Sequence, residues 1–184
     1  MTSSSGLSAE FTERKELALL SAPLESRGSL YFVPPDRFAR FTVQPEFTAL
    51  VIDGDRVRFR EGAEADEIDL SANPMTRAFV DNFVVLWSGD RERLERLYAA
   101  TLRVEGGGWE LSLAPRDAPL DRFIEAVVLR GSGNALEQMV VRDRDGDRTV
   151  TSIRSVRLDR SFSAGELERI FAHGMPVDGP ADGR

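Results

Sequence analysis

The sequence has no cysteine, a single histidine and a single lysine among its 184 residues. Without cysteine, the chain can form no disulfide bond, no zinc–thiolate site and no cysteine nucleophile. The histidine, His173, lies near the expected end of the last helix, where a cation interacts favourably with the helix dipole. A triad of His173 with Ser163 or Ser161 and Asp159 would need another geometry, so we predict no catalytic residue and no enzyme.

The sequence also lacks a hydrophobic run that could cross a bilayer, which takes about 20 apolar residues in a helix. Its first residues, Met1–Leu7, have neither the basic nor the apolar part of a signal peptide. The net charge is −7 and the isoelectric point is near 4.9. This balance disfavours nucleic acids and general adhesion to anionic membranes, because both select basic surfaces.

What remains is a chain with 41% hydrophobic residues, enough for a sizeable core. No linker divides it, and its two ends are small, polar or rich in Gly, Pro and Asp. We therefore predict a single domain over residues 8–173, with flexible termini at residues 1–7 and 174–184.

Short strand patterns dominate the chain, and Pro, Gly and Asp residues separate them. Such a succession, interrupted by central helices, predicts an α+β fold with one large, curved antiparallel sheet wrapped around helices. The expected strands are Ser29–Val33, Arg37–Val43, Glu46–Asp53, Arg56–Glu61, Glu67–Leu70, Leu102–Glu105, Trp109–Ala114, Arg122–Arg130, Leu136–Arg142 and Arg148–Leu158.

Helix patterns are expected at four places: Ser8–Ser21, Asn73–Ser88, Arg91–Ala100 and a segment from Ser163 to about His173. The first carries Phe11, Leu17 and Leu20 as an apolar stripe and has Ser8 as its N-cap. The last begins with a capping-box pattern of Ser163 and Glu166.

The helix pattern at Asn73–Ser88 places four large apolar residues, Met75, Phe79, Phe83 and Leu86, at spacings of four, four and three on one face. A stripe of this kind is typical of a plain core helix. The alternative is a flexible lid over a cavity, because Met and Phe repack readily around apolar chains.

Several polar patterns have a structural and a functional interpretation. Asp143, Asp145 and Asp147 resemble a calcium loop, but the distal Glu of such a loop is missing and a hairpin turn explains them. The glycines after Arg130 fit a turn rather than a dinucleotide loop. An acidic cluster could bind a cation or a basic partner, or form a solvated loop: Glu61, Glu64, Asp66, Glu67 and Asp69. A basic cluster could bind lipid headgroups or an acidic exporter domain, or belong to a strand with one side in water: Arg37, Arg40, Arg56, Arg58 and Arg60.

Four segments together resemble the periplasmic outer-membrane lipoprotein carrier family, the LolA-like proteins. Gly28–Phe41 is similar to the family's Gly-x-Leu segment followed by Arg-Pro-x-x-Phe, and Val51–Val57 resembles its Asp-Gly hairpin. Trp109–Pro115 resembles a strand that ends in a Pro-containing turn, and Leu120–Asp159 a closing three-strand meander. In the first motif, Pro34 stands where the family has an Arg that latches the lid, so the chain resembles a divergent member.

The resemblance implies a half-barrel whose concave face is hydrophobic and covered by helices. It implies a monomeric periplasmic carrier without cofactor or metal, which binds lipid or lipoprotein acyl chains and shuttles them toward the outer membrane. An inner-membrane exporter is the partner that such a carrier would have. The alternative is a lipid-sensing or protein-interaction module on the same fold. The residues expected to line the cavity and lid are Leu17, Leu20, Tyr31, Phe38, Phe41, Met75, Phe79, Phe83 and Leu86.

Overall fold

The computed structural model of the chain describes residues 4–177. Eleven strands form one sheet in the order β6-β5-β4-β3-β2-β1-β11-β10-β9-β8-β7. The strands are β1 (Ser4–Glu16), β2 (Leu24–Val33), β3 (Arg37–Gln44), β4 (Thr48–Asp53), β5 (Arg56–Glu61), β6 (Glu64–Asp69), β7 (Tyr98–Glu105), β8 (Gly108–Pro115), β9 (Ile124–Ser132), β10 (Ala135–Asp143) and β11 (Arg148–Phe162).

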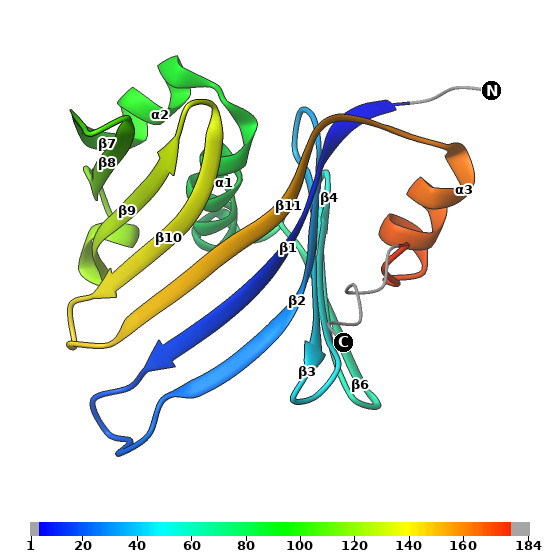
Figure 1. Cartoon of the computed structure of the whole chain (residues 1–184). Coiled ribbons are helices and arrows are strands. Elements are labelled where there is room, and N and C mark those ends of the chain that lie inside the picture. The colour runs from blue at the N-terminus through cyan, green and yellow to red at the C-terminus, as the bar shows by residue number, and fades with distance from the viewer. Residues whose placement is uncertain (1–3, 178–184) are drawn as a thin grey trace. The chain divides into compact units, whose positions relative to one another are not determined.

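Three α-helices accompany the sheet: α1 (Pro74–Ser88), α2 (Arg91–Leu97) and α3 (Ala164–Leu167). A short 3-10 helix lies at Leu120–Arg122, and one turn of π-helix, Glu168–Ala172, continues α3. Sequence neighbours pair antiparallel from β2 to β6 and from β7 to β11. The predicted α+β class with one large antiparallel sheet is confirmed (Figure 1).

The chain divides into two compact units. Among the described residues, the first unit comprises 4–11, 26–77 and 155–177, and the second comprises 12–25 and 78–154. Strands β1, β2 and β11 and helix α1 therefore contribute residues to both units. The domain bounds predicted from the sequence stay a prediction, and residues 1–3 and 178–184 of the expected flexible ends lie outside the described residues.

The predicted helix Ser8–Ser21 is wrong, because this segment forms strand β1. Its Ala, Glu, Arg, Lys and Leu residues favour a helix locally. The strand instead lies between β2 and β11 in the sheet, and Ala9 and Phe11 are buried there. Tertiary pairing thus overrides a weak helical propensity.

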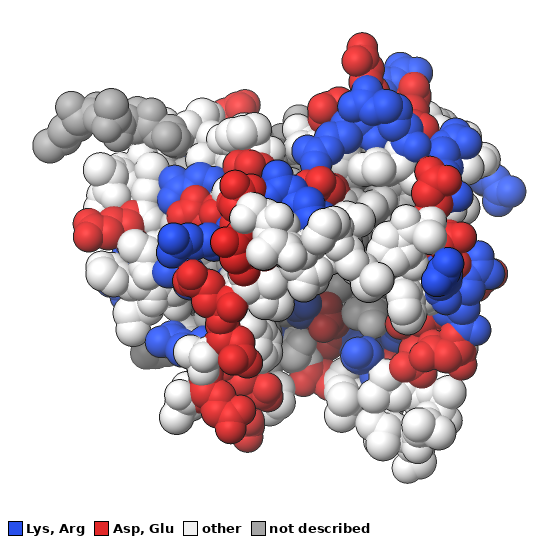
Figure 2. Space-filling view, turned by 180° about the vertical axis from the view of Figure 1, so that it is seen from behind, with Lys and Arg blue, Asp and Glu red and all other residues white. Residues whose placement is uncertain are grey.

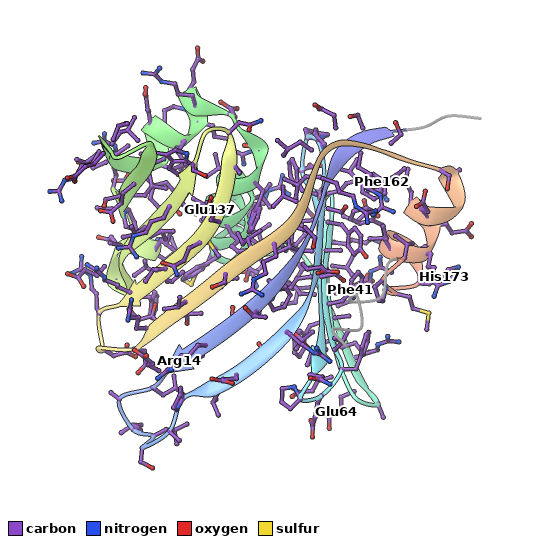
Figure 3. The ribbon with its side chains drawn as sticks, viewed as in Figure 1. Arg14, Phe41, Glu64, Glu137, Phe162 and His173 are labelled. Atoms are coloured by element: carbon purple, nitrogen blue, oxygen red, sulfur yellow. The ribbon has the colours of Figure 1, made fainter. Side chains whose placement is uncertain are left out.

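The first unit has a core between its strands and the segment that contains α3. The odd-numbered residues of β2, β3 and β4 face this segment, as the antiparallel register requires. Phe41 lies on the sheet side and Phe162 precedes the helix, and both side chains enter the same layer (Figure 3). The buried residues are Tyr31, Val33, Ala39, Phe41, Ala49, Val51, Phe162, Ile170 and Phe171.

Two local features fix the first unit's geometry. The predicted capping box is present, since the Ser163 hydroxyl accepts from the Glu166 N–H while the Glu166 carboxylate accepts from the Ser163 N–H. Gly28 lies at a register shift between β2 and β3, and a Cβ there would come within 1.8 Å of the Phe41 carbonyl oxygen. Only glycine fits such a close approach of two backbones.

The second unit packs α1 and α2 with strands β7–β10. Helix α2 is shorter than predicted, because Tyr98 already begins β7. Val127, Val128 and Leu129 of β9 are all buried, as expected for a strand with apolar side chains on both faces. One buried core cluster of this unit comprises Val85, Tyr98, Leu113, Leu120, Val127, Leu129 and Met139.

Candidate functional site

The predicted cavity residues fall into three separate groups. Tyr31 and Phe41 belong to the first unit's core, whereas Phe38 lies on the opposite face of β3, because it is an odd number of residues from Phe41. Phe79, Phe83 and Leu86 lie on α1 in the second unit, and Met75 is 66% exposed in the first turn of that helix. Leu17 and Leu20 lie in the turn between β1 and β2 rather than on a helix.

The protein's own side chains fill the core that contains Tyr31 and Phe41. The Tyr31 ring meets the rings of Phe41 and Phe162 edge to face, with centroids 5.9 and 6.2 Å apart. Phe41, Phe162 and Phe171 are each 0% exposed. Edge-to-face rings at this spacing form a close-packed aromatic cluster, so these rings stabilise the fold.

The apolar layer of the second unit is different, because many of its side chains are only partly buried. Rings of Phe79 and Phe123 approach to 5.7 Å, yet Phe123 is 57% exposed. Phe83 and Trp87 pair at 6.3 Å on the same helix. We call this set the α1 layer. Its partly buried members are Phe79, Leu86, Trp87, Leu94, Leu97, Trp109, Leu111, Ile124, Leu136 and Val141, together with Phe83.

One buried polar contact holds α1 to the sheet beside this layer. The Tyr98 hydroxyl of β7 donates to the Asn82 carbonyl of α1 at 3.0 Å, and the Asn82 side chain donates to the Ala78 carbonyl at 2.7 Å. Burial raises the pKa of Tyr98, so the phenol stays neutral and a donor. Sequence reasoning missed this contact, because neither residue is distinctive without the fold.

Arg56 of β5 faces water as predicted, but Arg58 and Arg60 of the same strand are partly buried. Arg58 donates to the carbonyls of Phe171 and Ala172 at the end of the π-turn, and Arg60 donates to the Gly174 carbonyl at 3.3 Å. Cationic donors at the carbonyl end of a helix satisfy groups that have no partner within the helix. These arginines therefore fasten the α3 segment onto the sheet.

The other arginines of the basic cluster also have partners. Arg37 bonds Asp53 at 2.8 Å and stacks 4.1 Å from the centroid of Phe171. Arg40 lies over Phe11, and Arg56 reaches Glu67 across the β5–β6 pair. In Figure 2, basic side chains lie next to acidic ones in most places. The headgroup interpretation of this cluster consequently has no support in the geometry.

Two surface hollows differ from the α1 layer in having charged residues in their lining. In the first unit, a pocket of 240 Å³ has Ala49 and Val51 as its floor and Arg58, Arg60 and His173 at its rim. In the second, a polar groove of 410 Å³ is lined by charged pairs such as Glu110 and Arg130, which are 2.8 Å apart. The first hollow is smaller than most small-molecule sites, and the charges of the second are paired with one another. Neither hollow therefore has the features expected of a ligand site.

The remaining candidate motifs are turns or helix ends. Asp143, Asp145 and Asp147 form the β10–β11 hairpin turn, with their carboxylates within 4.8 Å of one another. Burial and the two neighbouring carboxylates raise the pKa of Asp143. Ser163 is engaged in the capping box, and the exposed His173, which points away from the sheet in Figure 3, lies 3.7 Å from Glu168.

No helix among residues 4–177 combines the length and the hydropathy that a membrane crossing requires. No curated protein sequence matches the chain. Solved structures match its fold, and one is a DUF1329 family protein from Desulfovibrio piger, with 13% identity, a TM-score of 0.50, and 92% of this chain and 90% of that chain covered.

Two further solved structures are similar. MucB, in the complex structure of Pseudomonas aeruginosa MucA/MucB, matches with 13% identity and a TM-score of 0.50, over 89% of this chain and 55% of that chain. A LolA superfamily protein from Nitrosomonas europaea matches with 12% identity and a TM-score of 0.47, over 90% of this chain and 89% of that chain. Residues 1–161 match the family described as outer membrane lipoprotein carrier protein, LolA-like. The chain is therefore a divergent member of the LolA-like family.

Proposed function

We propose that the protein is a periplasmic carrier that binds acyl chains of lipids or lipoproteins in the α1 layer of its second unit. The observation that supports this proposal is the incomplete burial of that layer. Helix α1 has apolar residues on most of its surface, yet only Asn82, Val84 and Val85 are buried. A helix that is apolar all round is stable only when something covers it, and an acyl chain is such a cover.

The physical chemistry of the layer suits reversible binding. Burial of an acyl chain gains about 0.8 kcal/mol for each methylene group. The layer is made of Phe, Trp, Leu and Ile side chains, so it has apolar surface and few polar atoms that would select one headgroup. Such a surface binds chains of several lengths and releases them to another apolar phase, which is what a carrier requires.

Within this proposal, three of the predicted α1 residues contact cargo, whereas the predicted sheet residues do not. Phe79, Phe83 and Leu86 line the cargo layer, whereas Tyr31 and Phe41 stabilise the first unit. Phe38 and Met75 lie outside the α1 layer, and Leu17 and Leu20 belong to the β1–β2 turn. We propose no catalytic step, because binding and release of an acyl chain need none.

The direct test compares cargo binding by the wild type and by Phe83→Glu. The variant should fold but take up a fluorescent fatty-acyl probe at least about tenfold more weakly, because a carboxylate would enter the apolar layer. Leu158→Glu is the matched control, since Leu158 is 48% exposed on β11 in the first unit. Mass spectrometry of an organic extract of the wild type should find stoichiometric lipid. Normal probe uptake by Phe83→Glu would show that acyl chains do not bind in the α1 layer.

A second candidate function, protein interaction, is favoured by one observation at the sheet edge. Strand β7 ends the sheet, and its residues after Tyr98 are exposed, including Leu102 at 61% and Val104 at 71%. The opposite edge, β6, carries Glu64, Asp66, Glu67 and Asp69, which deter pairing with another strand. Strand β7 has only Arg103 and Glu105 as charged residues, and an edge strand with exposed apolar side chains can accept a partner strand.

The two functions differ in what Val104→Glu should change. If the protein acts as an interaction module, this substitution should abolish binding of a partner recovered with the wild-type protein, while probe uptake is unaffected. If it acts as a carrier alone, Val104→Glu should leave both the lipid extract and probe transfer to vesicles unchanged. A wild type with an empty extract and no probe uptake would favour the interaction function.

A further inference from the structure

The turn between β1 and β2 is the most exposed apolar segment among the described residues. It runs Leu-Ala-Leu-Leu-Ser-Ala-Pro-Leu over residues 17–24 and contains no charge. Leu19 is 97% exposed, Leu24 is 53% exposed and Leu20 is 47% exposed. Water-exposed leucines scattered singly are ordinary, but three within six residues form a patch that indicates a binding surface.

The turn is fixed in place by hydrogen bonds. The Leu20 N–H donates to the Leu17 carbonyl at 2.9 Å, and the Ala18 N–H donates to the Asp147 carboxylate of the β10–β11 turn at 2.8 Å. Figure 1 shows both turns at the same end of their hairpins within the second unit. The leucines are therefore presented by an ordered turn.

Charged residues flank the leucines on both strands. Arg14, Lys15 and Glu16 precede the turn on β1, and Glu25 and Arg27 follow it on β2. Arg14, which Figure 3 labels beside the turn, pairs with Glu16 at 3.2 Å, and Arg148 of β11 lies 3.7 Å from the same carboxylate. The turn is therefore apolar, and the strand residues next to it are charged. The surface of a bilayer has the same order of polarity, with apolar acyl chains beneath charged headgroups.

We infer that residues 17–24 form a membrane-docking tip, which inserts Leu19, Leu20 and Leu24 into the headgroup and acyl boundary of a lipid bilayer. Unpaired backbone groups make insertion into lipid costly, and the bonded Ala18 and Leu20 N–H groups and the N–H-free Pro23 lower this cost.

The charge around the tip specifies the kind of membrane. Asp143, Asp145 and Asp147 lie in the adjoining turn, and the whole chain carries a net charge of −7. The cations Arg14, Lys15, Arg27 and Arg148 offset most of the carboxylates near the tip, so no positive excess attracts anionic headgroups. Docking therefore depends on the leucines, and the net negative charge of the chain favours zwitterionic over anionic lipid. The tip goes beyond the proposed carriage of acyl chains, since its residues lie outside the α1 layer.

Flotation with phosphatidylcholine vesicles tests this inference on the full chain. The wild type should float, and Leu19→Glu should lower the vesicle-bound fraction about tenfold, as expected when one buried leucine is replaced by a charge. Val104→Glu is the control, because it changes another exposed apolar side chain on β7 of the same unit. Adding phosphatidylglycerol at low salt should weaken wild-type binding.

Acyl-probe uptake in the same samples separates this inference from the proposed function. Leu19→Glu should retain probe uptake while it loses flotation, and Phe83→Glu should show the reverse. A wild type that does not float, equal loss in Leu19→Glu and Val104→Glu, or stronger binding to phosphatidylglycerol would each overturn the docking tip. Loss of probe uptake in Leu19→Glu would also overturn it, since the leucine would then belong to the cargo layer.

Discussion

The two units differ in how completely they bury their apolar core side chains. In the first unit, the core cluster around Phe41 has nine buried residues, and only Phe47, Leu167 and Val177 pack against it partly buried. In the second unit, the core cluster around Leu113 has seven buried residues and ten that are only partly buried. The first unit thus completes its own core, whereas the second leaves apolar area that its fold does not cover.

The difference follows from how each unit holds its helical segment. The α3 segment is fixed by a capping box at its start, by Arg58 and Arg60 at its end, and by Phe171, which is fully buried. Helix α1 is held by the buried bond through Tyr98 and by ion pairs of Asp81 with Arg93 and of Arg77 with Asp55, while its contacts in the second unit's core are apolar.

The largest expected effect comes from removing one ring from each unit. Phe171→Ala should lower the free energy of unfolding by about 3–5 kcal/mol, because it leaves a cavity in a closed core. Phe79→Ala should lower it by about 1–2 kcal/mol, because its ring is already partly in water. Urea unfolding of both variants measures the difference, and equal losses would break the distinction between the units.

The next effect concerns the fastening of α3. Arg58→Ala should lower the free energy of unfolding by about 1.5–3 kcal/mol, since the carbonyls of Phe171 and Ala172 lose a charged donor. Arg56→Ala is the matched control on the same strand and should cost about 0–1 kcal/mol, because its pair with Glu67 is exposed. Thermal unfolding measures the difference. If both variants lowered the midpoint temperature equally, Arg58 would have no special role.

The smallest effect is the response of the capping box to acid. Hydrogen bonds from the Ser163 backbone and hydroxyl lower the pKa of Glu166, with a smaller contribution from Arg160. A carboxyl whose pKa is lower in the folded state stabilises the fold at pH values above its unfolded pKa, near 4.5, and loses that contribution as the pH falls further. Glu166→Gln should flatten this acid dependence in urea titrations, while a slope equal to the wild type's would show that other groups carry it.

Much of the secondary structure could be predicted, because alternating apolar residues and turn residues are local signals. β3, β5 and α1 begin and end within a residue or two of the predicted bounds. The failure at β1 has a clear cause: its composition favours a helix, and only its place between β2 and β11 makes it a strand. Because the predicted helix does not form, Leu17 and Leu20 lie in the β1–β2 turn and not on a lid.

The sequence by itself determined the fold class, the family, the exclusion of thiol chemistry and the capping box at Ser163, because each depends on residue types at short spacing. The tertiary structure decided which apolar residues are closed into a core and which stay partly open. It separated Phe41 from Phe83 and placed Arg58 on carbonyls up to 114 residues away. Burial depends on what lies across a sheet or under a helix, and such neighbours are distant in the chain.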